Sequence, residues 1–326
     1  MVRCYTRLSL YVVSALLCWP LLVHAQGNFP ARPIRIISPF APGGSTSTIA
    51  RVIGQKLTES WGQQIIVDNR PGGNTIIGAD TLAKASPDGY SYILTTNTHI
   101  INPSLFPKLP YEPIRDFAPV GMVYSSEFVL VITSGLAANN LQELIALARA
   151  KPGQLNYATT GAGGSSHLAN VLLGMQTGVQ IQHIPYKGAG PALVDLIGGQ
   201  VHMFMNNPLT VIAHIRSGRI KGIAVTGTAR VPALPQVPTF TEGGVPGIDV
   251  NPWFCLLAPA GTPKPIINKV STEVTRIMAL PDVLDYLAKQ GMSAYTSTPE
   301  QLDARMKGDM ARWAKVIKAA NIKIDI

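Results

Sequence analysis

Two glycine-rich loops carry the residues whose types and spacing are best suited to chemistry. The first is Pro42-Gly-Gly-Ser45 and the second is Gly161-Ala-Gly-Gly-Ser-Ser-His167. Each follows a short strand-like run and precedes apolar residues at helical spacing. In such a unit the loop amides and the helix N-terminus direct partial positive charge at one spot. The sequence therefore predicts an anion-binding device, present twice, that needs no Lys or Arg.

Other chemistries fit these residues less well. A serine hydrolase would place glycine two residues before and two residues after its nucleophile, and neither Ser165 nor Ser166 has that spacing. A dinucleotide site would need a third glycine after Gly44, although Asp68 lies near the right place for the acid. The histidines and cysteines show no metal-ligand spacing, so we expect no cofactor and no bound metal.

A structural role is an alternative for each of these residues. Tight strand-to-helix turns favour glycine because it tolerates positive φ. The Ser and Thr residues after the glycines could cap helices, His167 could be a surface or core histidine, and Tyr186-Lys-Gly188 could be a plain turn. The functional interpretation is favoured because the two loops lie in separate halves of the chain, where they could face each other across one cleft.

Alternating strands and helices would hold the loops. We expect strands at 64–67, 90–95, 127–133, 156–160, 179–184, 202–205 and 220–226. Helices should follow the two glycine loops, span about 75–85 and 191–197 and open at Asn140, and three closing helices should begin near Pro265, Pro281 and Pro299. This alternation predicts parallel pairing in an α/β fold. Ligands in such sheets lie beyond the carboxyl ends of the strands, so the polar loop 97–103 should share a rim with Gly43 and Gly44. Residues 105–119 should be irregular, and the run 251–258 could cross between the halves.

The first 25 residues have the pattern of a segment that is cleaved from the mature protein. A basic start is followed by an apolar run from Leu8 to Val23 and by a small-x-small cleavage signal that ends at Ala25. This pattern predicts a secretory signal peptide with cleavage near Ala25. A membrane anchor is disfavoured, because the apolar run of roughly 16 residues contains Pro20 and is shorter than the about 20 residues of a spanning helix. A lipoprotein is disfavoured because Leu17 is not the small residue expected before a lipidated cysteine.

Composition narrows the function further. The chain has 27 Lys and Arg against 18 Asp and Glu, and removing Arg3 and Arg7 with the signal leaves 25 against 18, a formal balance of +7. Because no basic run concentrates this excess, nucleic-acid binding is disfavoured and a mild attraction for anionic solutes is expected. Only Cys255 would remain, so no internal disulfide can form. About 300 residues suggest two domains.

Five motifs carry a resemblance to a known family. They are Pro30-Ala-Arg-Pro-Ile-Arg35 with Pro42-Gly-Gly-Ser45, Leu109-Pro-Tyr111 with Asp116-Phe-Ala-Pro119, Gly161-Ala-Gly163 with His167-Leu-Ala169, Pro185-Tyr-Lys-Gly188 with Gly190-Pro-Ala192, and Leu234-Pro-Gln-Val-Pro-Thr-Phe240 with Glu242 and Gly244. Together they closely resemble the Bug family, the periplasmic solute receptors of tripartite tricarboxylate transporters. The resemblance covers essentially the whole mature chain.

The resemblance implies a periplasmic binding protein of the type II class. Two α/β domains of such a Venus flytrap are joined by crossing strands, and we place them at residues 28–124 plus 254–326 and at 125–253. Small carboxylates are the implied ligands, and hinge closure is the implied mechanism. Membrane permease subunits are the implied partners of a monomeric receptor. A sensor subunit for a two-component system is the alternative, and a serine hydrolase using Ser165 or Ser166 with His167 is a further one.

The ligand should contact the two glycine loops, and the side chains of Asn97, Tyr186 and Asn206 should line the sides of the site. We predict contacts from Phe40, Ala41, Pro42, Gly43, Gly44, Ser45, Thr46, Asn97, Gly161, Ala162, Gly163, Gly164, Ser165, Ser166, His167, Tyr186 and Asn206.

Three positions depart from the family pattern. Ser47 and Asn206 stand where relatives usually carry Asp, and Gly164 stands where they carry Ser or Thr. If both missing acids line the cleft in relatives, this pocket has lost two negative charges. We therefore expect a ligand without a cationic amino group.

Overall fold

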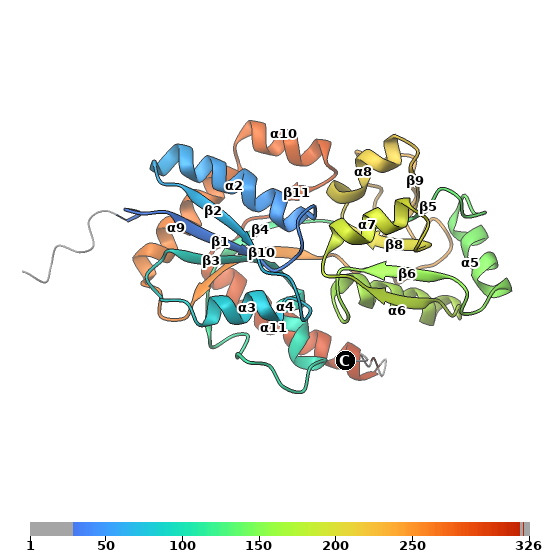
Figure 1. Ribbon diagram of the computed structural model, residues 1–326, viewed down its shortest axis with the longest axis horizontal. Coiled ribbons are helices and arrows are strands. Elements are labelled where there is room, and N and C mark those ends of the chain that lie inside the picture. Colours follow the sequence, from blue (N-terminus) through green and yellow to red (C-terminus); the bar gives the residue numbers. More distant parts are fainter. Residues whose placement is uncertain (1–28, 320–321, 323–326) are drawn as a thin grey trace, which may run out of the picture.

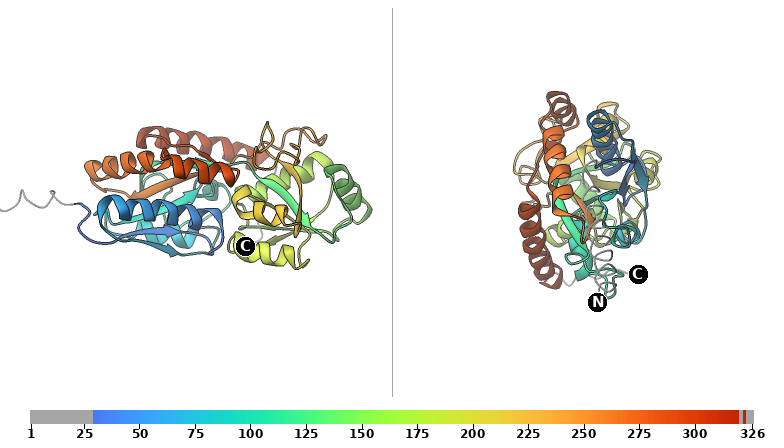
Figure 2. Two further views of the ribbon diagram at one scale, coloured as in Figure 1. Left: turned by 90° about the horizontal axis from the view of Figure 1, so that it is seen from above. Right: turned by 90° about the vertical axis from the view of Figure 1, so that its left-hand side faces the viewer.

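Two β-sheets lie in separate lobes, side by side along the long axis of the molecule (Figure 1). The computed structural model describes residues 29–319 and residue 322, so the predicted signal peptide lies outside the described residues. Helices cover both faces of each sheet, and the two further views in Figure 2 show the same two lobes from above and from one end. The predicted two-lobed α/β fold of the Venus flytrap type is confirmed.

The first lobe is built on a six-stranded sheet in the order β11-β4-β10-β3-β1-β2. Its strands are β1 (Ile34–Ser38), β2 (Ile65–Asn69), β3 (Ser91–Thr96), β4 (Phe117–Ser125), β10 (Trp253–Pro259) and β11 (Ser293–Ala294). Its helices are α2 (Ser45–Trp61), α3 (Ile76–Ala83), α4 (Thr98–Ile101), the 3₁₀ helix η1 (Asn102–Ser104), α9 (Lys264–Met278), α10 (Pro281–Lys289) and α11 (Pro299–Ala319).

The second lobe is built on a five-stranded sheet in the order β7-β6-β8-β5-β9. Its strands are β5 (Val129–Thr133), β6 (Asn156–Thr159), β7 (Gln182–Pro185), β8 (Met203–Asn206) and β9 (Ile220–Val225). Its helices are α5 (Leu141–Ala150), α6 (Ser165–Thr177), α7 (Ala189–Ile197) and α8 (Pro208–Arg216). The chain passes between the lobes after β4 and again before β10.

Strands with apolar residues on both faces explain why each lobe has three layers. In β1, Ile36 packs with α2, α9 and α10, whereas its neighbour Ile37 packs with α3, α4 and α11. In β5, Val131 faces α7 and α8, whereas Ile132 faces α5 and α6. Because successive side chains of a strand point to opposite faces, such runs need helices on both sides.

Several elements differ from the sequence-based expectation. Strand β4 and helices α4 and α8 had no predicted counterpart, and α4 with η1 occupies the predicted polar loop 97–103. Parallel pairing holds for β1 with β2 and β3 and for β6 with β7 and β8, but β10 and β5 pair antiparallel with their neighbours. These two strands directly follow the passages between lobes, so they enter their sheets without the helical crossover that imposes parallel pairing.

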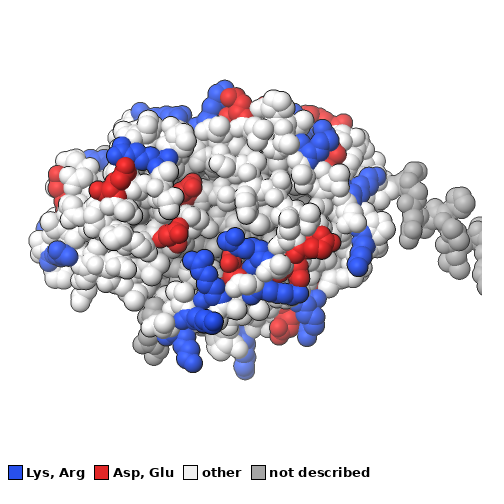
Figure 3. Space-filling view, turned by 180° about the vertical axis from the view of Figure 1, so that it is seen from behind, with Lys and Arg blue, Asp and Glu red and all other residues white. Residues whose placement is uncertain are grey.

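Charged side chains are intermixed over the face shown in Figure 3. Lys and Arg gather in its lower part together with Asp and Glu, and its middle carries few charges. Within residues 29–319, no helix combines the length and apolar character that crossing a bilayer requires.

A buried carboxylate fastens the last helix to the strand that re-enters the first lobe. Asp309 on α11 accepts hydrogen bonds at 2.7 Å from Nε1 of Trp253 and at 2.7 Å from Nε of Arg305. Both Asp309 and Trp253 are buried. The indole N–H has no other acceptor among the described residues, so its satisfaction depends on this carboxylate.

We expect Asp309→Ala to lower the free energy of unfolding by about 2 to 3 kcal/mol, because it leaves a buried N–H and a guanidinium without their acceptor. Urea titration followed by tryptophan fluorescence measures this change. Asp303→Ala on the same helix is the control, since it removes only an exposed pair with Lys307 and should change stability by less than about 0.5 kcal/mol. Equal effects of the two substitutions would contradict the assignment.

Candidate functional site

Two helices begin at the glycine loops with unsatisfied backbone donors. Gly44 is the N-cap of α2 and Gly164 is the N-cap of α6, and neither helix start has a side-chain cap. The amides of residues 45–47 and 165–167 donate to no partner within the described part of the chain, where the first intrahelical bonds are from Thr48 and Leu168. These first-turn N–H groups carry the partial positive charge of the helix ends.

Two further helices begin close to the starts of α2 and α6. Ala189 opens α7, and Asn207 is the N-cap of α8. Together with α2 and α6 they surround a cavity between the lobes. Its lining consists of Phe40, Gly44, Ser45, Thr46, Thr96, Thr98, Phe128, Thr160, Ser165, Ser166, Ala189, Asn206, Asn207, Pro252 and Phe254.

The lining contains no Asp, Glu, Lys, Arg or His among the described residues. Its polar part is made of hydroxyl groups and of the amides of Asn206 and Asn207. Its apolar part is made mainly of three phenylalanine rings with Pro252 and Ala189. An anion in this cavity would therefore be held by backbone and hydroxyl donors and by four helix dipoles.

Ser45, Ser165 and Ser166, which follow the glycines, use their hydroxyl groups for hydrogen bonds within or between the lobes and do not cap the helices. Ser165 Oγ donates to Asn97 Oδ1 of the other lobe at 2.7 Å, and Ser45 Oγ donates to Asn207 Oδ1 at 3.3 Å. Ser166 Oγ donates to the carbonyl of Met205 at 2.6 Å. The capping alternative is therefore wrong for Ser45, Ser165 and Ser166, and neither serine of the second loop bonds to His167.

Asn207 is a donor that the cavity leaves unused. Its side chain is buried and its Nδ2 has no hydrogen-bond partner among the described residues. Ser45 donates to its Oδ1, which fixes the orientation of the side-chain amide and leaves only Nδ2 without a partner in the described part of the chain. The neighbouring Asn206 uses its Oδ1 to accept from the amide of Asn207 at 2.7 Å. A buried amide N–H₂ without an acceptor is costly, so it marks a place for a ligand oxygen or a water molecule.

The backbones of the two lobes touch beside the cavity. The amide of Ala41 donates to the carbonyl of Lys187 at 2.9 Å. Next to this bond, a Cβ added to Gly43 would lie 3.3 Å from the Cα of Gly190. A Cβ on Gly190 would collide with the carbonyl oxygen of Pro42. Glycine at position 190 is therefore required for the close approach of two backbone segments, whereas Gly43 also has a positive φ of 92° that favours glycine by itself.

A second cavity shares Thr160 with the first. Its lining consists of Pro39, Gly72, Gly73, Asn74, Thr75, Thr160, Gly161, Ala162, Pro185, Tyr186 and Lys187. Tyr186 turns its hydroxyl away to Asp195, to which it donates at 2.6 Å. Asn74 and Thr75 have positive φ angles of 50° and 76°, and Asn74 bonds to Asn102 at 2.8 Å.

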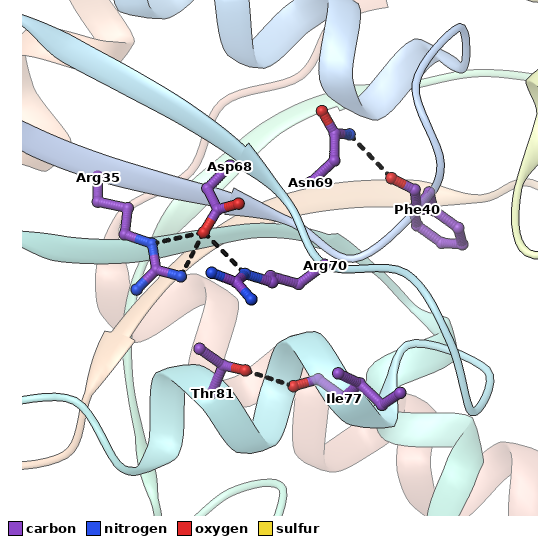
Figure 4. A network of polar contacts seen from close by, with 7 residues as sticks. All are labelled: Arg35, Phe40, Asp68, Asn69, Arg70, Ile77 and Thr81. Atoms are coloured by element: carbon purple, nitrogen blue, oxygen red, sulfur yellow. Dashed lines mark hydrogen bonds and ion pairs between the residues drawn. The ribbon is translucent and has the colours of Figure 1, made fainter.

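A network at the carboxyl ends of β1 and β2 holds the first glycine loop (Figure 4). Asp68 accepts from the guanidinium groups of Arg35 and Arg70. The adjacent Asn69 donates to the carbonyl of Phe40 at 2.8 Å. Burial alone would raise the pKa of the Asp68 carboxyl. The hydrogen bonds and positive charges of Arg70 and Arg35 together outweigh burial, so the pKa is lowered. The network fixes the strand end from which the Phe40 side chain reaches the cavity.

His167 stabilises its loop from within. The amide of Gly163 donates to its Nδ1 at 3.0 Å, and its ring stacks on His183 with centroids 4.1 Å apart. Burial lowers the pKa of His167 to about 3, and the neighbouring His183 adds to this effect. Because Nδ1 must be an acceptor, His167 is neutral here and shapes the loop.

The predicted site residues fall into three groups. Those that line the main cavity are Phe40, Gly44, Ser45, Thr46, Ser165, Ser166 and Asn206. Those that line the second cavity are Gly161, Ala162 and Tyr186. Those that line neither are Ala41, Pro42, Gly43, Asn97, Gly163, Gly164 and His167, which build the loops and the contacts between lobes.

Sequence reasoning missed Thr96, Thr98, Phe128, Thr160, Ala189, Asn207, Pro252 and Phe254. Thr96 and Thr98 flank Asn97 at the end of β3, so the rule for strand ends could have found them. Phe128 and Pro252 lie in the passages between lobes, where no periodicity indicates which side chains face the cleft.

Of the two positions where an acid is expected in relatives, only one lies at this cavity. Asn206 lines the cavity, but Ser47 does not: it is fully buried and its Oγ donates to the carbonyl of Gly44 at 3.2 Å. Among the described residues no group of three or more His, Cys, Asp or Glu is arranged to hold a metal ion.

Comparisons with known proteins agree with this geometry. The model of the tripartite tricarboxylate transporter family receptor matches residues 49–322. Protein BugT of Bordetella pertussis is 36% identical over 326 residues, covering 99% of this chain and 99% of the relative. The structure of Rpa4515 of R. palustris with adipate has a TM-score of 0.88 at 34% identity, covering 90% of this chain and 99% of that one. MatC of Rhodopseudomonas palustris with bound malate has a TM-score of 0.84 at 32% identity, covering 89% and 100%.

We expect stability to fall in acid partly because of His167. Its pKa is depressed in the folded state to about 3, against about 6.5 when unfolded, so the unfolded chain binds the extra proton as the pH falls below 6.5. Between pH 7 and pH 5 this should remove roughly 2 kcal/mol of folding free energy.

Urea titrations at the two pH values test this in the wild type and in His167→Asn, whose side-chain oxygen can still accept from Gly163. The difference between pH 7 and pH 5 should shrink by about 2 kcal/mol in the variant. An unchanged difference would mean that His167 takes up its proton equally in both states. His214→Asn is the control, because that histidine lies in the last turn of α8, away from the cavity lining.

Proposed function

Because the chain belongs to the tripartite tricarboxylate transporter receptor family, we propose that it is a periplasmic receptor that captures a small carboxylate between its lobes by hinge closure. The observation that carries this proposal is the convergence of four helix starts, of which α2 and α6 have unpaired first-turn amides, on one cavity without charged lining residues. The adipate and malate in the structures of two relatives support a carboxylate as the ligand.

Binding by donors alone is sufficient for useful affinity. Each hydrogen bond to a charged acceptor contributes about 1.5 to 3 kcal/mol. About four such bonds would therefore give micromolar affinity after the costs of ordering. The unpaired first-turn amides of α2 and α6 and the Nδ2 of Asn207 are available to make them.

Hinge closure follows from the way the donors are divided. Residues 44–46 belong to the lobe of the six-stranded sheet, whereas residues 165–166 and 206–207 belong to the other lobe. A carboxylate that bridges both sets stabilises the closed arrangement over the open one. We propose that the moving bodies are residues 28–124 plus 254–326 and residues 125–253, with the two passages between lobes as the hinge.

Delivery to membrane permease subunits of a tripartite tricarboxylate transporter is the next step that we propose, after export directed by residues 1–25. A periplasmic sensor subunit remains the alternative, and the genes beside this one would separate the two. The chain is not an enzyme: its family and structural relatives are solute-binding proteins, and the serines of the second loop do not pair with His167.

We expect a thermal-shift screen of mono-, di- and tricarboxylates and aromatic acids to find a stabilising ligand without turnover. A ligand at 100 times its Kd stabilises the folded state by about 2.7 kcal/mol. Asn207→Asp places a carboxylate in the cavity and should weaken binding of that acid at least 100-fold, as measured by calorimetry. Asn268→Asp, an equal charge change at an exposed position of α9, should leave the Kd unchanged. The proposal fails if no acid binds or if both variants behave alike.

Closure itself can be tested outside the cavity. We expect Gly190→Ala to weaken acid binding about tenfold, because its Cβ would meet the carbonyl of Pro42 only when the lobes touch. Small-angle scattering should show a smaller ligand-induced compaction in this variant. Gly135→Ala, where the added Cβ meets nothing within 4 Å, is the matched control. Unaltered affinity in Gly190→Ala would argue that the lobes do not close by this contact.

A further inference from the structure

The apolar part of the main cavity is largely aromatic. Phe40, Phe128 and Phe254 all line it, together with Pro252. Phe128 and Phe254 also pack into the apolar clusters of the two lobes, which accounts for their presence without any ligand. Phe254 stacks on Tyr124 with ring centroids 4.0 Å apart.

Phe40 has no such explanation. Its ring is only 8% exposed, yet it belongs to none of the three apolar clusters of the described residues. Its backbone is already held by Asn69, which bonds to its carbonyl oxygen and not to the ring. A ring that lines the cavity and belongs to none of these apolar clusters is placed to contact what enters the cavity.

The cavity offers hydrogen-bond donors for a carboxylate but no cationic side chain to pair with a second charge. The unpaired Nδ2 of Asn207 and the free first-turn amides define one polar region. No lining residue is cationic. A second carboxylate placed against the phenylalanine rings would lose its hydration without gaining a counter-charge, which is strongly unfavourable.

The nearest lining cation belongs to the second cavity. Lys187 lines that cavity, and its side chain is exposed. The two cavities share Thr160. A diacid could therefore satisfy its second charge only by extending out of the main cavity toward Lys187, and its binding would then depend on that residue.

We propose that the ligand is a monocarboxylic acid with an uncharged, apolar and preferably aromatic body, and that Phe40 is a specificity-determining residue for it. This inference rests on the proposed function, since it names the kind of acid that the same cavity accepts. The single carboxylate occupies the region of Asn207 and the helix starts, and the body packs on the phenylalanine rings.

Two pairs of acids isolate the second charge at nearly constant shape. 4-Methylbenzoate is compared with terephthalate, and hexanoate with adipate, by calorimetry on the full mature chain after unfolding, dialysis and refolding to remove any retained ligand. The monoacid should bind at least tenfold more tightly than its diacid in each pair, and 4-methylbenzoate more tightly than hexanoate. A diacid that binds more tightly than its monoacid overturns the inference.

Two variants test the role of the ring. Phe40→Ala should weaken 4-methylbenzoate binding about tenfold or more, and it should also lower the melting temperature without ligand, because the residue is buried. Phe106→Ala is the matched control: Phe106 packs against a core cluster but does not line either cavity, so stability should fall and affinity should not. Unchanged affinity in Phe40→Ala also overturns the inference.

The outcomes separate this inference from the proposed function. Tight diacid binding that Lys187→Ala abolishes would support a carboxylate receptor and overturn the monoacid inference. If none of the four acids binds but a tricarboxylate or a hydroxy diacid does, the monoacid inference again falls alone. If no acid of any class binds, the proposed function falls with it.

Discussion

The structure depends on one constraint, which is that the backbone N–H groups of a first helical turn have no partners inside the helix. Four helices of the two lobes start at one cavity, and α2 and α6 direct such unpaired groups at it. Glycine stands at the N-cap of α2, α6 and α7, and none of the four starts has a side-chain cap. The lining hydroxyls and amides add donors without adding charge. Recognition by such groups depends on the positions of backbone atoms, so everything that fixes the loops also fixes the site.

Much of the surrounding structure can be understood as support for those positions. Asn69 holds the carbonyl of Phe40, and His167 accepts from the amide of Gly163 inside the second loop. The carbonyl of Lys187 accepts from the amide of Ala41 in the opposite lobe. This hydrogen bond sets the position of the first glycine loop relative to the second lobe. These interactions act on the backbone rather than on a ligand, which explains why predicted residues such as Gly163, Gly164 and His167 lie outside the cavity lining.

The sequence indicated the fold and the two loops because both leave local patterns. Glycines between an apolar run and a helical period mark strand, loop and helix, and the structure has that unit at Gly44 and at Gly164. Strand β4 was missed because its Pro-rich approach masks the start of a nine-residue strand. Phe128, Pro252 and Phe254 could not be assigned to the cavity, because the direction in which a passage between lobes turns its side chains is set by tertiary contacts. Ser47 shows the converse: it lies beside cavity residues in sequence, but the helix turns it into the interior.

The position of β10 has a consequence for the order in which the molecule can assemble. This strand lies between β3 and β4 in the sheet of the first lobe, although more than a hundred residues separate it from either in sequence. The five strands of the other lobe are contiguous in the chain, so that lobe can form while the rest is still incomplete. The first lobe must keep β3 and β4 apart until Trp253–Pro259 arrives, a long-range closure that is intrinsically slow. Chains truncated before β10 would thus retain one folded half and expose the apolar edges of the other, a substrate for proteases and chaperones rather than a weakened receptor.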